Sequence, residues 1–248
     1  MEAARVLALR GFKPVLFEQA AVLGGQIRMA SILPHKDKVL WLLDHLERQL
    51  LDLGVEIRLN TAPSMDEIKA LQPWAVFLAT GARPSLPPIE GIDQPQVCTV
   101  DRVLRGELGF TGKRVAVLGS GLTGLETALY LAGQGNQVTV VEVQKQIGPG
   151  VLPILLMDVL PRLRELGVQL LADARLTAVA AGCIKLEGAV TELEVDAVVV
   201  AAGVKSRREL LDELEVNFEN VQVIGDAARP GKIGNAMYAG FDQAYVLS

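Results

Sequence analysis

The sequence is poor in the residues that build metal centres, disulfide frameworks and nucleophilic active sites. It contains two cysteines and two histidines among 248 residues. Cys98 and Cys183 are too far apart for a Cys-x-x-Cys pair, so we expect no dithiol chemistry, zinc site or four-cysteine iron–sulfur cluster. No serine or cysteine has an evident triad, so we predict no catalytic side chain and no metal ligand. So few cysteines favour a reducing, cytoplasmic location.

Long apolar runs and an excess of positive charge are missing as well. Hydrophobic residues make up 50% of the chain, which is enough for a buried core. No run approaches the roughly 18–20 apolar residues that cross a bilayer, because Asp196 interrupts the longest one at residues 195–204. Residues 1–5 lack the apolar stretch of a signal peptide. A net charge of −5 provides no basic face for phosphate backbones, so neither membranes nor nucleic acids are expected as partners.

The best-defined segment is a strand, a glycine turn, a helix and a second strand within residues 113–142. Residues 114–118 form a short apolar run, typical of a buried parallel strand. A helical pattern follows the turn up to Gly133, and the strand at residues 138–141 ends at Glu142. The turn is a Gly-x-Gly-x-x-Gly motif made of Gly119, Ser120, Gly121, Leu122, Thr123 and Gly124.

This arrangement indicates a dinucleotide site. The first glycine permits a tight turn, the second lets backbone N–H groups approach a pyrophosphate, and the third lets helix and strand pack closely. The helix N-terminus adds free N–H groups and a positive dipole end. Glu142 lies 23 residues after Gly119 (142 − 119), where a carboxylate accepts hydrogen bonds from both ribose hydroxyls. It would repel a 2′-phosphate, which favours NADH over NADPH. The alternative is a solvated glutamate at a strand end.

The N-terminal residues repeat this segment at an offset of 124. Seven of the 23 positions from residue 2 to residue 24 are identical to residues 126–148, and Glu18 falls on Glu142. Two unrelated helices of this kind could also share alanine, leucine and glycine. Such a chance likeness explains the matching carboxylates less well. Glu18 is therefore expected to hold the adenosine ribose of a second dinucleotide. The counterpart of residues 113–124 would precede Met1, so we expect a truncated chain that opens within a helix.

Further glycines follow apolar strands or lie in loops beside them. Carboxyl ends of parallel strands are where α/β sheets bind ligands. Asp226 is expected either to accept a hydrogen bond from a sugar-like hydroxyl or to act as a turn residue, and the pair at residues 24–25 either admits a ligand or is an ordinary loop. The residues concerned are Gly24, Gly25, Gln26, Thr80, Gly81, Gly203, Gly225 and Asp226.

The remaining pattern completes an α/β fold. We predict two interleaved Rossmann-like domains, each in three layers with mostly parallel sheets. A leucine stripe at residues 39–53 predicts a core-facing helix, and prolines at residues 84–88 mark a linker. Further strands are expected at residues 55–59, 75–79, 168–171, 195–202 and 221–224, and further helices at residues 155–166 and after Gly234.

Together these motifs resemble the two-dinucleotide flavoprotein reductases. The ordered set spans nearly the whole chain, at residues 23–26, 79–81, 119–124, 201–203 and 223–226. It is most similar to the C-terminal region of the NADH:flavin oxidoreductases related to 2,4-dienoyl-CoA reductase, trimethylamine dehydrogenase and NADH oxidase. The segments that carry this closer resemblance are residues 33–36, 103–106, 121–126 and 235–240.

The resemblance implies FAD or ADP in a first domain, residues 1–94 plus 215–248, and NADH in a second, residues 95–214. It also implies a separate N-terminal barrel domain with FMN and a 4Fe-4S cluster, which receives electrons from NADH through FAD. The FAD site would include Glu18, Gly24, Gly25, Gln26, Thr80, Gly81, Gly225 and Asp226. The NADH site would include Gly119, Gly121, Gly124 and Glu142, and Gly203 belongs to the cofactor-binding set.

Two departures from the family pattern shape the expectation. The first repeat has no glycine turn, so several charge-assisted contacts of about 1.5–3 kcal/mol each are lost and FAD should bind weakly or not at all. The absent cysteine pair excludes the dithiol chemistry of thioredoxin and glutathione reductases. One alternative is a non-catalytic ADP- or NAD-binding module with a structural or regulatory role. Another is a self-contained disulfide or ferredoxin reductase. The sequence carries no signature of an oligomeric state.

Overall fold

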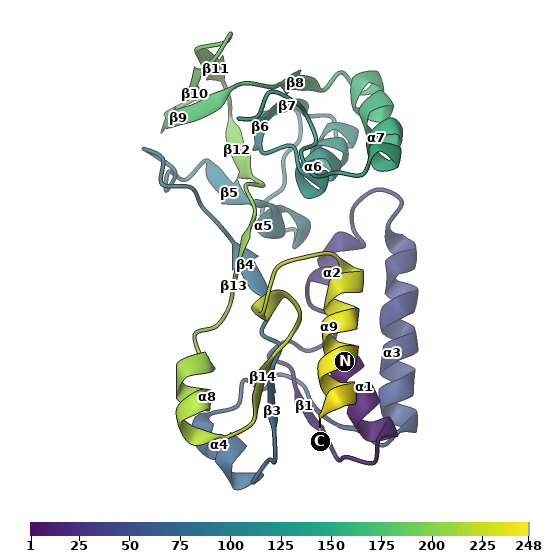
Figure 1. Ribbon diagram of the computed structural model, residues 1–248. Coiled ribbons are helices and arrows are strands. Elements are labelled where there is room, and N and C mark those ends of the chain that lie inside the picture. The colour runs from purple at the N-terminus through teal and green to yellow at the C-terminus, as the bar shows by residue number, and fades with distance from the viewer. Residues whose placement is uncertain (248) are drawn as a thin grey trace. The chain divides into compact units, whose positions relative to one another are not determined.

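A computed structural model describes residues 1–247 (Figure 1). They form two compact units. Unit 1 comprises Met1–Ser31, Asp37–Arg83 and residues 204–247, and unit 2 comprises Ile32–Lys36 and Pro84–Gly203. The long segment of unit 2 therefore begins and ends 11 residues before the boundaries predicted for the NADH domain (95 − 84 and 215 − 204). Which dinucleotide each unit holds stays a prediction.

Unit 2 is built on a five-stranded parallel sheet. Its order is β5-β12-β6-β7-β8, and every pairing is parallel. The strands are short and strongly apolar, as expected for a sheet that is covered on both faces. Their bounds are β5 Val97–Thr99, β12 Ala197–Val200, β6 Arg114–Leu118, β7 Gln137–Val141 and β8 Gln169–Leu171.

Helices cover one face of this sheet. The helix α6, Leu122–Gly133, follows β6 directly and contacts β6, β7 and the helix α7, Pro153–Glu165. Leu125 and Leu131 of α6 are fully buried. The proline at the start of α7 supplies a backbone angle already suited to a helix. The short helix α5, Val100–Leu104, follows β5.

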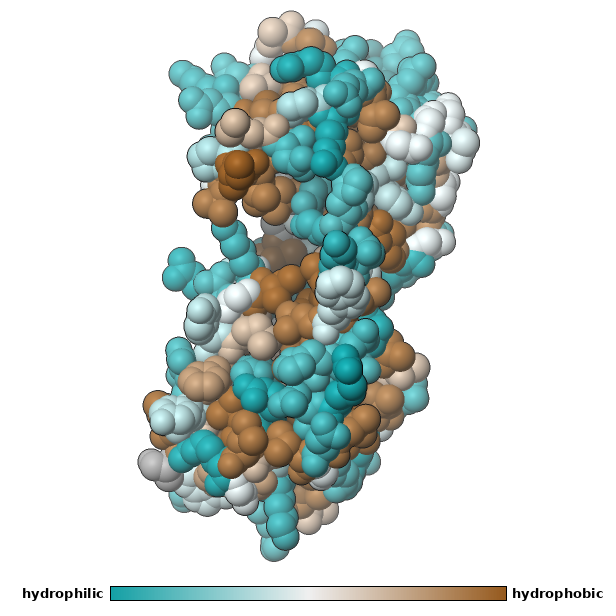
Figure 2. Space-filling model, turned by 90° about the vertical axis from the view of Figure 1, so that its right-hand side faces the viewer, coloured by the Kyte–Doolittle hydropathy of each residue, from teal (hydrophilic) through white to brown (hydrophobic). Residues whose placement is uncertain are grey.

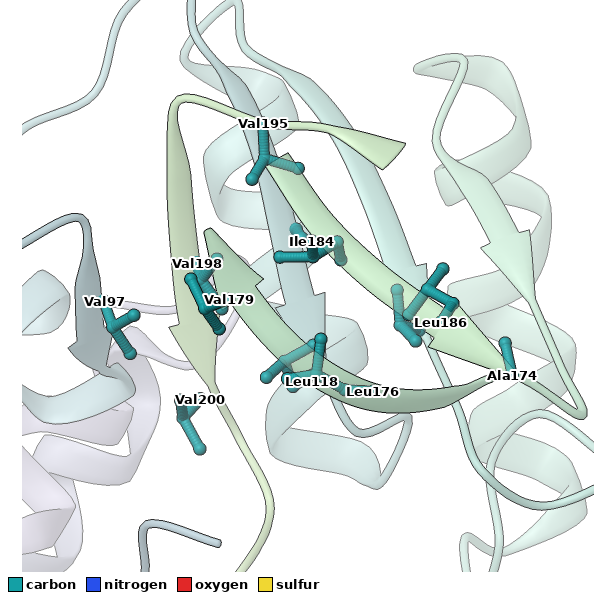
Figure 3. Packing of buried hydrophobic residues seen from close by; sticks show 12 residues of the cluster. Val97, Leu118, Ala174, Leu176, Val179, Ile184, Leu186, Val195, Val198 and Val200 are labelled. Atoms are coloured by element: carbon teal, nitrogen blue, oxygen red, sulfur yellow. The ribbon is translucent and has the colours of Figure 1, made fainter. Parts of the chain in front are cut away.

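The opposite face is covered by a small antiparallel sheet, which the sequence reading did not anticipate. Its strands are β9 Arg175–Ala180, β10 Cys183–Glu187 and β11 Glu192–Glu194, in the order β11-β10-β9. In β10, Ile184 and Leu186 are buried and their neighbours are not. Figure 3 shows these side chains packed with Leu118 and Val198 of the parallel sheet. Unit 2 thus has three layers.

Unit 1 contains two separate parallel strand pairs. The strand β1, Val15–Phe17, pairs with β2, Glu56–Arg58, and β14, Val221–Val223, pairs with β3, Val76–Leu78. In unit 2, β6 lies between β12 and β7. The 124-residue offset gives β6 no counterpart within residues 1–248, and no strand in the described chain joins the two pairs.

Three helices supply most of the unit 1 core: α1, Glu2–Leu9, α3, Leu40–Asp52, and α9, Ile233–Val246. The predicted leucine stripe is confirmed, because Leu43, Leu46 and Leu50 of α3 are buried. At the contact between α1 and α9, a Cβ on Gly240 would lie 3.3 Å from the backbone nitrogen of Ala3. The small residue therefore permits the close approach of the two helices.

Shorter elements complete unit 1 and its connections. Helix α4, Met65–Ala70, begins with a capping box between Ser64 and Glu67. The predicted linker begins at β4, Ala82–Pro84, which pairs with β13, Val204–Ser206. The remaining elements are α2 Gln26–Ala30, α8 Leu211–Asn217 and the 3-10 helices η1 Asp37–Val39 and η2 Gly225–Ala227.

The face drawn in Figure 2 carries both polar and hydrophobic side chains. In unit 2, Ile154 and Met157 of α7 are among the most exposed hydrophobic residues, at 68% and 73%. Across residues 1–247, no helix combines the length and the hydropathy needed to cross a bilayer.

Candidate functional site

The glycine turn of unit 2 joins the end of β6 to the start of α6, as predicted. Gly119 has φ +99°, and a Cβ there would lie 2.7 Å from the carbonyl oxygen of Ala201 at the end of β12. A Cβ on Gly124 would overlap the carbonyl oxygen of Gly119. Packing inside the unit therefore requires glycine at both positions.

Gly121 has no such requirement. It is the N-cap residue of α6, with φ −58°, a value that any residue adopts. A Cβ there would meet no atom within 4 Å, and no side chain caps the helix. The first amide hydrogens of α6 lack partners within the helix. The turn thus presents an uncovered backbone surface at the place where the sequence predicts a pyrophosphate.

Glu142, at the end of β7, is bound to this turn. Its Oε2 accepts hydrogen bonds from the backbone N–H and the hydroxyl of Ser120, at 2.8 and 2.7 Å. Its Oε1 accepts one from the backbone N–H of Gln144 at 2.9 Å. Burial raises the pKa of the Glu142 carboxyl, but the hydrogen bonds from Ser120 and from the two residues after Glu142 outweigh it, so the pKa lies below its usual value.

The burial of Glu142 corrects one expectation. The side chain is 4% exposed, so the alternative of a solvated glutamate is wrong. The contact with both ribose hydroxyls stays a prediction, and those hydroxyls would share the carboxylate with the donors it already has. The sequence predicts Ser120 among the cofactor-binding residues of the turn, but its N–H and hydroxyl both donate to Glu142 and the residue is buried, so its own amide is not free for a pyrophosphate.

A small polar cavity of about 230 Å³ lies beside Glu142. The backbone N–H of Ala174 donates to the Glu142 carbonyl at 2.9 Å, which fixes the loop after β8 next to the end of β7. Within the cavity, Arg175 Nε lies 3.8 Å from Glu187 Oε2. Its lining consists of Val143, Asp173, Arg175, Glu187 and Gly188. Sequence reasoning missed these residues because they come from separate segments that only the fold brings together.

Lys36 and Glu126 form an ion pair at 2.6 Å between Nζ and Oε2. Glu126 lies on α6, two residues after the third glycine, and is 14% exposed. Lys36 belongs to the segment Ile32–Lys36, which is part of unit 2. Both residues lie in segments that carry the family resemblance, and the structure shows that these segments meet.

Unit 1 reproduces part of this geometry around Glu18. The Glu18 Oε1 accepts a hydrogen bond from the backbone N–H of Ala20 at 2.8 Å. With the 124-residue offset this is the counterpart of the bond between Glu142 and Gln144. Gly24 and Gly148 also correspond, and both have positive φ, at +112° and +78°. The repeat seen in the sequence therefore extends to three-dimensional contacts.

The residues predicted around a flavin partly assemble within unit 1. Gln26 begins α2 after Gly24 and Gly25, and its Nε2 donates to the Ala82 carbonyl at 3.4 Å, next to Gly81. The Thr80 hydroxyl donates to the carbonyl of Arg207 at 2.6 Å. Gln26, Thr80 and Gly81 thus lie near one another, although the Thr80 hydroxyl is already used by the backbone.

Gly225 and Asp226 lie in η2, where Asp226 acts as a turn residue. Its Oδ1 accepts a hydrogen bond from the backbone N–H of Gly231 at 3.1 Å. Its role toward a sugar hydroxyl stays a prediction. Gly203 follows β12, has φ +95° and is exposed, and a Cβ there would meet nothing within 4 Å.

The cysteines take no part in this site. Both are free, Cys98 is buried and Cys183 is partly buried. Burial raises the pKa of the Cys98 thiol to about 11, which keeps it protonated and unreactive at neutral pH. Within residues 1–247, no three His, Cys, Asp or Glu side chains gather as a metal site would require.

The fold and the glycine turn are typical of dinucleotide-binding proteins, and comparison with known proteins names the family. The family model described as pyridine nucleotide-disulphide oxidoreductase matches residues 1–240. The chain therefore belongs to the pyridine nucleotide-disulphide oxidoreductase family. The predicted fold class is confirmed.

Relatives at the level of sequence and structure agree with the predicted resemblance. The chain is 36% identical to an NADH oxidase of Thermoanaerobacter brockii and 35% identical to a bilirubin reductase of Mediterraneibacter gnavus, in each case over 100% of the chain and 39% of the relative. A 2-naphthoyl-CoA reductase structure superposes with a TM-score of 0.93 at 28% identity, covering 99% of this chain and 38% of that one. The chain thus spans about two fifths of the length of these relatives.

Proposed function

We propose that unit 2 binds NADH at its glycine turn, and that the chain is the nucleotide-binding portion of an NADH-dependent flavin oxidoreductase. The observation that carries the proposal is Gly121. Packing explains Gly119 and Gly124, but no atom of the described residues fills the space beside Gly121. A glycine with no neighbour at the start of an uncapped helix fits a backbone that must approach a ligand.

Each part of the proposed site has a physical task. The first amides of α6 and the positive end of its dipole bind the pyrophosphate. The polar cavity beside Val143 receives the adenosine end, next to Glu142. The buried negative charge of Glu142 disfavours a 2′-phosphate, so NADH is preferred over NADPH. Bound NADH supplies a hydride, and the residues of unit 2 orient the nucleotide.

Unit 1 is proposed as the flavin side of the full-length protein. We propose that Glu18 holds the adenosine ribose, and two observations support this: its Oε1 accepts one hydrogen bond, from Ala20, and the residue is only partly buried. The other proposed contacts are Gly24, Gly25, Gln26, Thr80, Gly81, Gly225 and Asp226. The single Gly-x-Gly-x-x-Gly of these 248 residues lies in unit 2, so unit 1 fits the adenosine of FAD better than its pyrophosphate.

The activity of the whole protein follows by analogy with its relatives. Their printed names are those of an NADH oxidase and of reductases, and this chain matches 38–39% of their length. We infer that hydride passes from NADH to FAD, and that electrons then pass to a barrel domain with FMN and a 4Fe-4S cluster. Lys36 and Glu126 order the segment at residues 32–36 against α6 in the same unit.

Titration of NADH into the 248-residue protein tests the proposed site. Isothermal calorimetry is expected to show saturable binding with one nucleotide per chain, and weaker binding of NADPH. Circular dichroism and a cooperative thermal transition establish that the sample is folded. Absence of saturable heat with folded protein contradicts the proposal.

A second candidate is a non-catalytic module that holds ADP or NAD. The observation that favours it is the incomplete phosphate site of unit 1, which suits a smaller adenine nucleotide as well as FAD. Stopped-flow mixing of the full-length protein with NADH separates the two functions. Loss of the oxidised flavin absorbance supports the oxidoreductase, and an unchanged flavin spectrum supports the binding module.

A further inference from the structure

Ser120 has contacts that the glycine motif does not demand. It occupies an x position of the motif and is completely buried, with 0% of its surface exposed. Its hydroxyl donates to Glu142 Oε2 at 2.7 Å and accepts from the backbone N–H of Gly148 at 2.9 Å. Its own N–H donates to the same carboxylate oxygen at 2.8 Å. One residue thus joins the glycine turn, the end of β7 and the loop at Gly148.

These contacts stabilise the charged form of the Glu142 carboxylate and its position. A buried carboxylate is costly unless donors surround it. Ser120 supplies both hydrogen bonds to Glu142 Oε2, and Gln144 supplies one to Oε1. Without the hydroxyl, Oε2 keeps only the backbone N–H of residue 120 as a donor, and the side chain of Glu142 is held less firmly. The hydroxyl therefore contributes to both the charge and the position of Glu142.

We propose that Ser120 is a positioning residue that sets the preference of unit 2 for NADH over NADPH by holding the Glu142 carboxylate at the turn. The inference rests on the proposed NADH site. A 2′-phosphate carries up to two negative charges, and a carboxylate that cannot turn away repels it. Ser120 itself touches no nucleotide in this account, because its side chain is covered by Glu142 and Gly148.

The test is the ratio of Kd for NADPH to Kd for NADH, measured by calorimetry on the 248-residue protein. Ser120→Ala is expected to lower this ratio about five- to tenfold, because one charge-assisted hydrogen bond no longer holds the carboxylate. Glu142→Gln lowers it further. In the Glu142→Gln background, Ser120→Ala leaves the ratio unchanged, because the charge through which it acts is gone.

Thr127 provides a matched control. It is also a fully buried hydroxyl residue on the same segment, and its Oγ1 donates to the Thr123 carbonyl at 2.7 Å, away from Glu142. Thr127→Ala is expected to lower the thermal midpoint and leave the Kd ratio unchanged. If Ser120→Ala does not fold, Ser120→Cys keeps a similar volume with a weaker donor, and an intermediate ratio is expected.

The outcomes separate the two claims. If wild type binds NADH saturably and Ser120→Ala keeps the wild-type ratio, the role of Ser120 is overturned and the NADH site stands. If Ser120→Ala shifts the Kd ratio equally in the wild-type and in the Glu142→Gln background, Ser120 does not act through the carboxylate, and the inference is overturned. If folded wild type shows no saturable NADH binding, the proposed function fails, and this inference fails with it.

Discussion

At the scale of single residues, the three glycines of the turn owe their identity to different neighbours. Gly119 and Gly124 lie against the backbone of unit 2, where any Cβ would overlap it. Gly121 lies against open space. The first two glycines are therefore required by the packing of the fold, and the third is the one that we propose to contact the ligand. Substitutions at the two kinds of position must consequently have separable effects.

Gly124→Ala tests the packing role. The position is helical, so the backbone angle poses no difficulty, and only the overlap with the Gly119 carbonyl matters. We expect a loss of about 1–3 kcal/mol in the free energy of unfolding, measured by urea denaturation. Gly133→Ala, at the end of the same helix, meets no atom within 4 Å, so it should be neutral or stabilising by up to about 1 kcal/mol. Equal stability of the two variants would refute the packing argument.

Some residues of the site could be predicted from the sequence, and others could not. The glycines and Glu142 were predictable, because the spacing of a strand, turn and helix dictates them. The bond from Ser120 to Glu142 and the cavity at Arg175 and Glu187 were not. They depend on how segments 22 residues apart (142 − 120) and up to 45 residues apart (188 − 143) pack, and such packing leaves no local periodicity in the sequence.

At the scale of elements, the parallel strands were predictable and the antiparallel sheet was not. Continuous apolar runs such as β6 and β12 are the pattern of a strand buried on both faces. In β10, buried Ile184 and Leu186 alternate with less buried residues over five positions, a short pattern that the sequence reading passed over. Pairing with β9 and burial against β12 define it instead.

The starts of β6 and β12 are joined by an exposed cluster around Arg114. Asp196 accepts hydrogen bonds from the Arg114 backbone N–H and from Nη2, both at 2.8 Å. These hydrogen bonds lower the pKa of the Asp196 carboxyl to about 2 from 3.8. A carboxyl with a lowered pKa stabilises the fold above its unfolded pKa and loses that contribution as the pH falls toward the folded value.

Asp196→Asn is therefore expected to be less stable than wild type at pH 7, with the difference shrinking between about pH 4 and pH 2. The effect is small because the pair is solvent-exposed. Urea unfolding of both proteins across this pH range measures it. A difference that is constant with pH contradicts the assigned role of the ion pair.

At the scale of the whole molecule, the two units share a repeated arrangement around a glutamate but differ in the glycine turn proposed to bind phosphate. Glu18 and Glu142 occupy matching positions and accept matching backbone hydrogen bonds. Only unit 2 has the glycine turn within the 248 residues, and the strand pairs of unit 1 remain separate in the described chain. The unit with the complete turn is the one for which nucleotide binding is expected to be strong.

This asymmetry predicts poor flavin retention by the 248-residue protein. The glycine turn that supplies several charge-assisted contacts to a pyrophosphate, each worth about 1.5–3 kcal/mol, occurs only in unit 2 within the 248 residues. We expect the purified protein to contain far less than one FAD per chain, measured by visible absorbance after heat release of the flavin. A full-length relative handled identically is the control. Stoichiometric yellow flavin in the 248-residue protein contradicts the expectation.

The central claim is that the backbone around Gly121 contacts the diphosphate of NADH. The most direct measurement is the Kd for NADH of Gly121→Ala beside that of Gly133→Ala, both in protein that a cooperative thermal transition shows to be folded. The account predicts that Gly121→Ala weakens binding about tenfold or more, because a methyl group fills the space that the phosphate needs, while Gly133→Ala binds as wild type does. Wild-type affinity in Gly121→Ala would contradict the account.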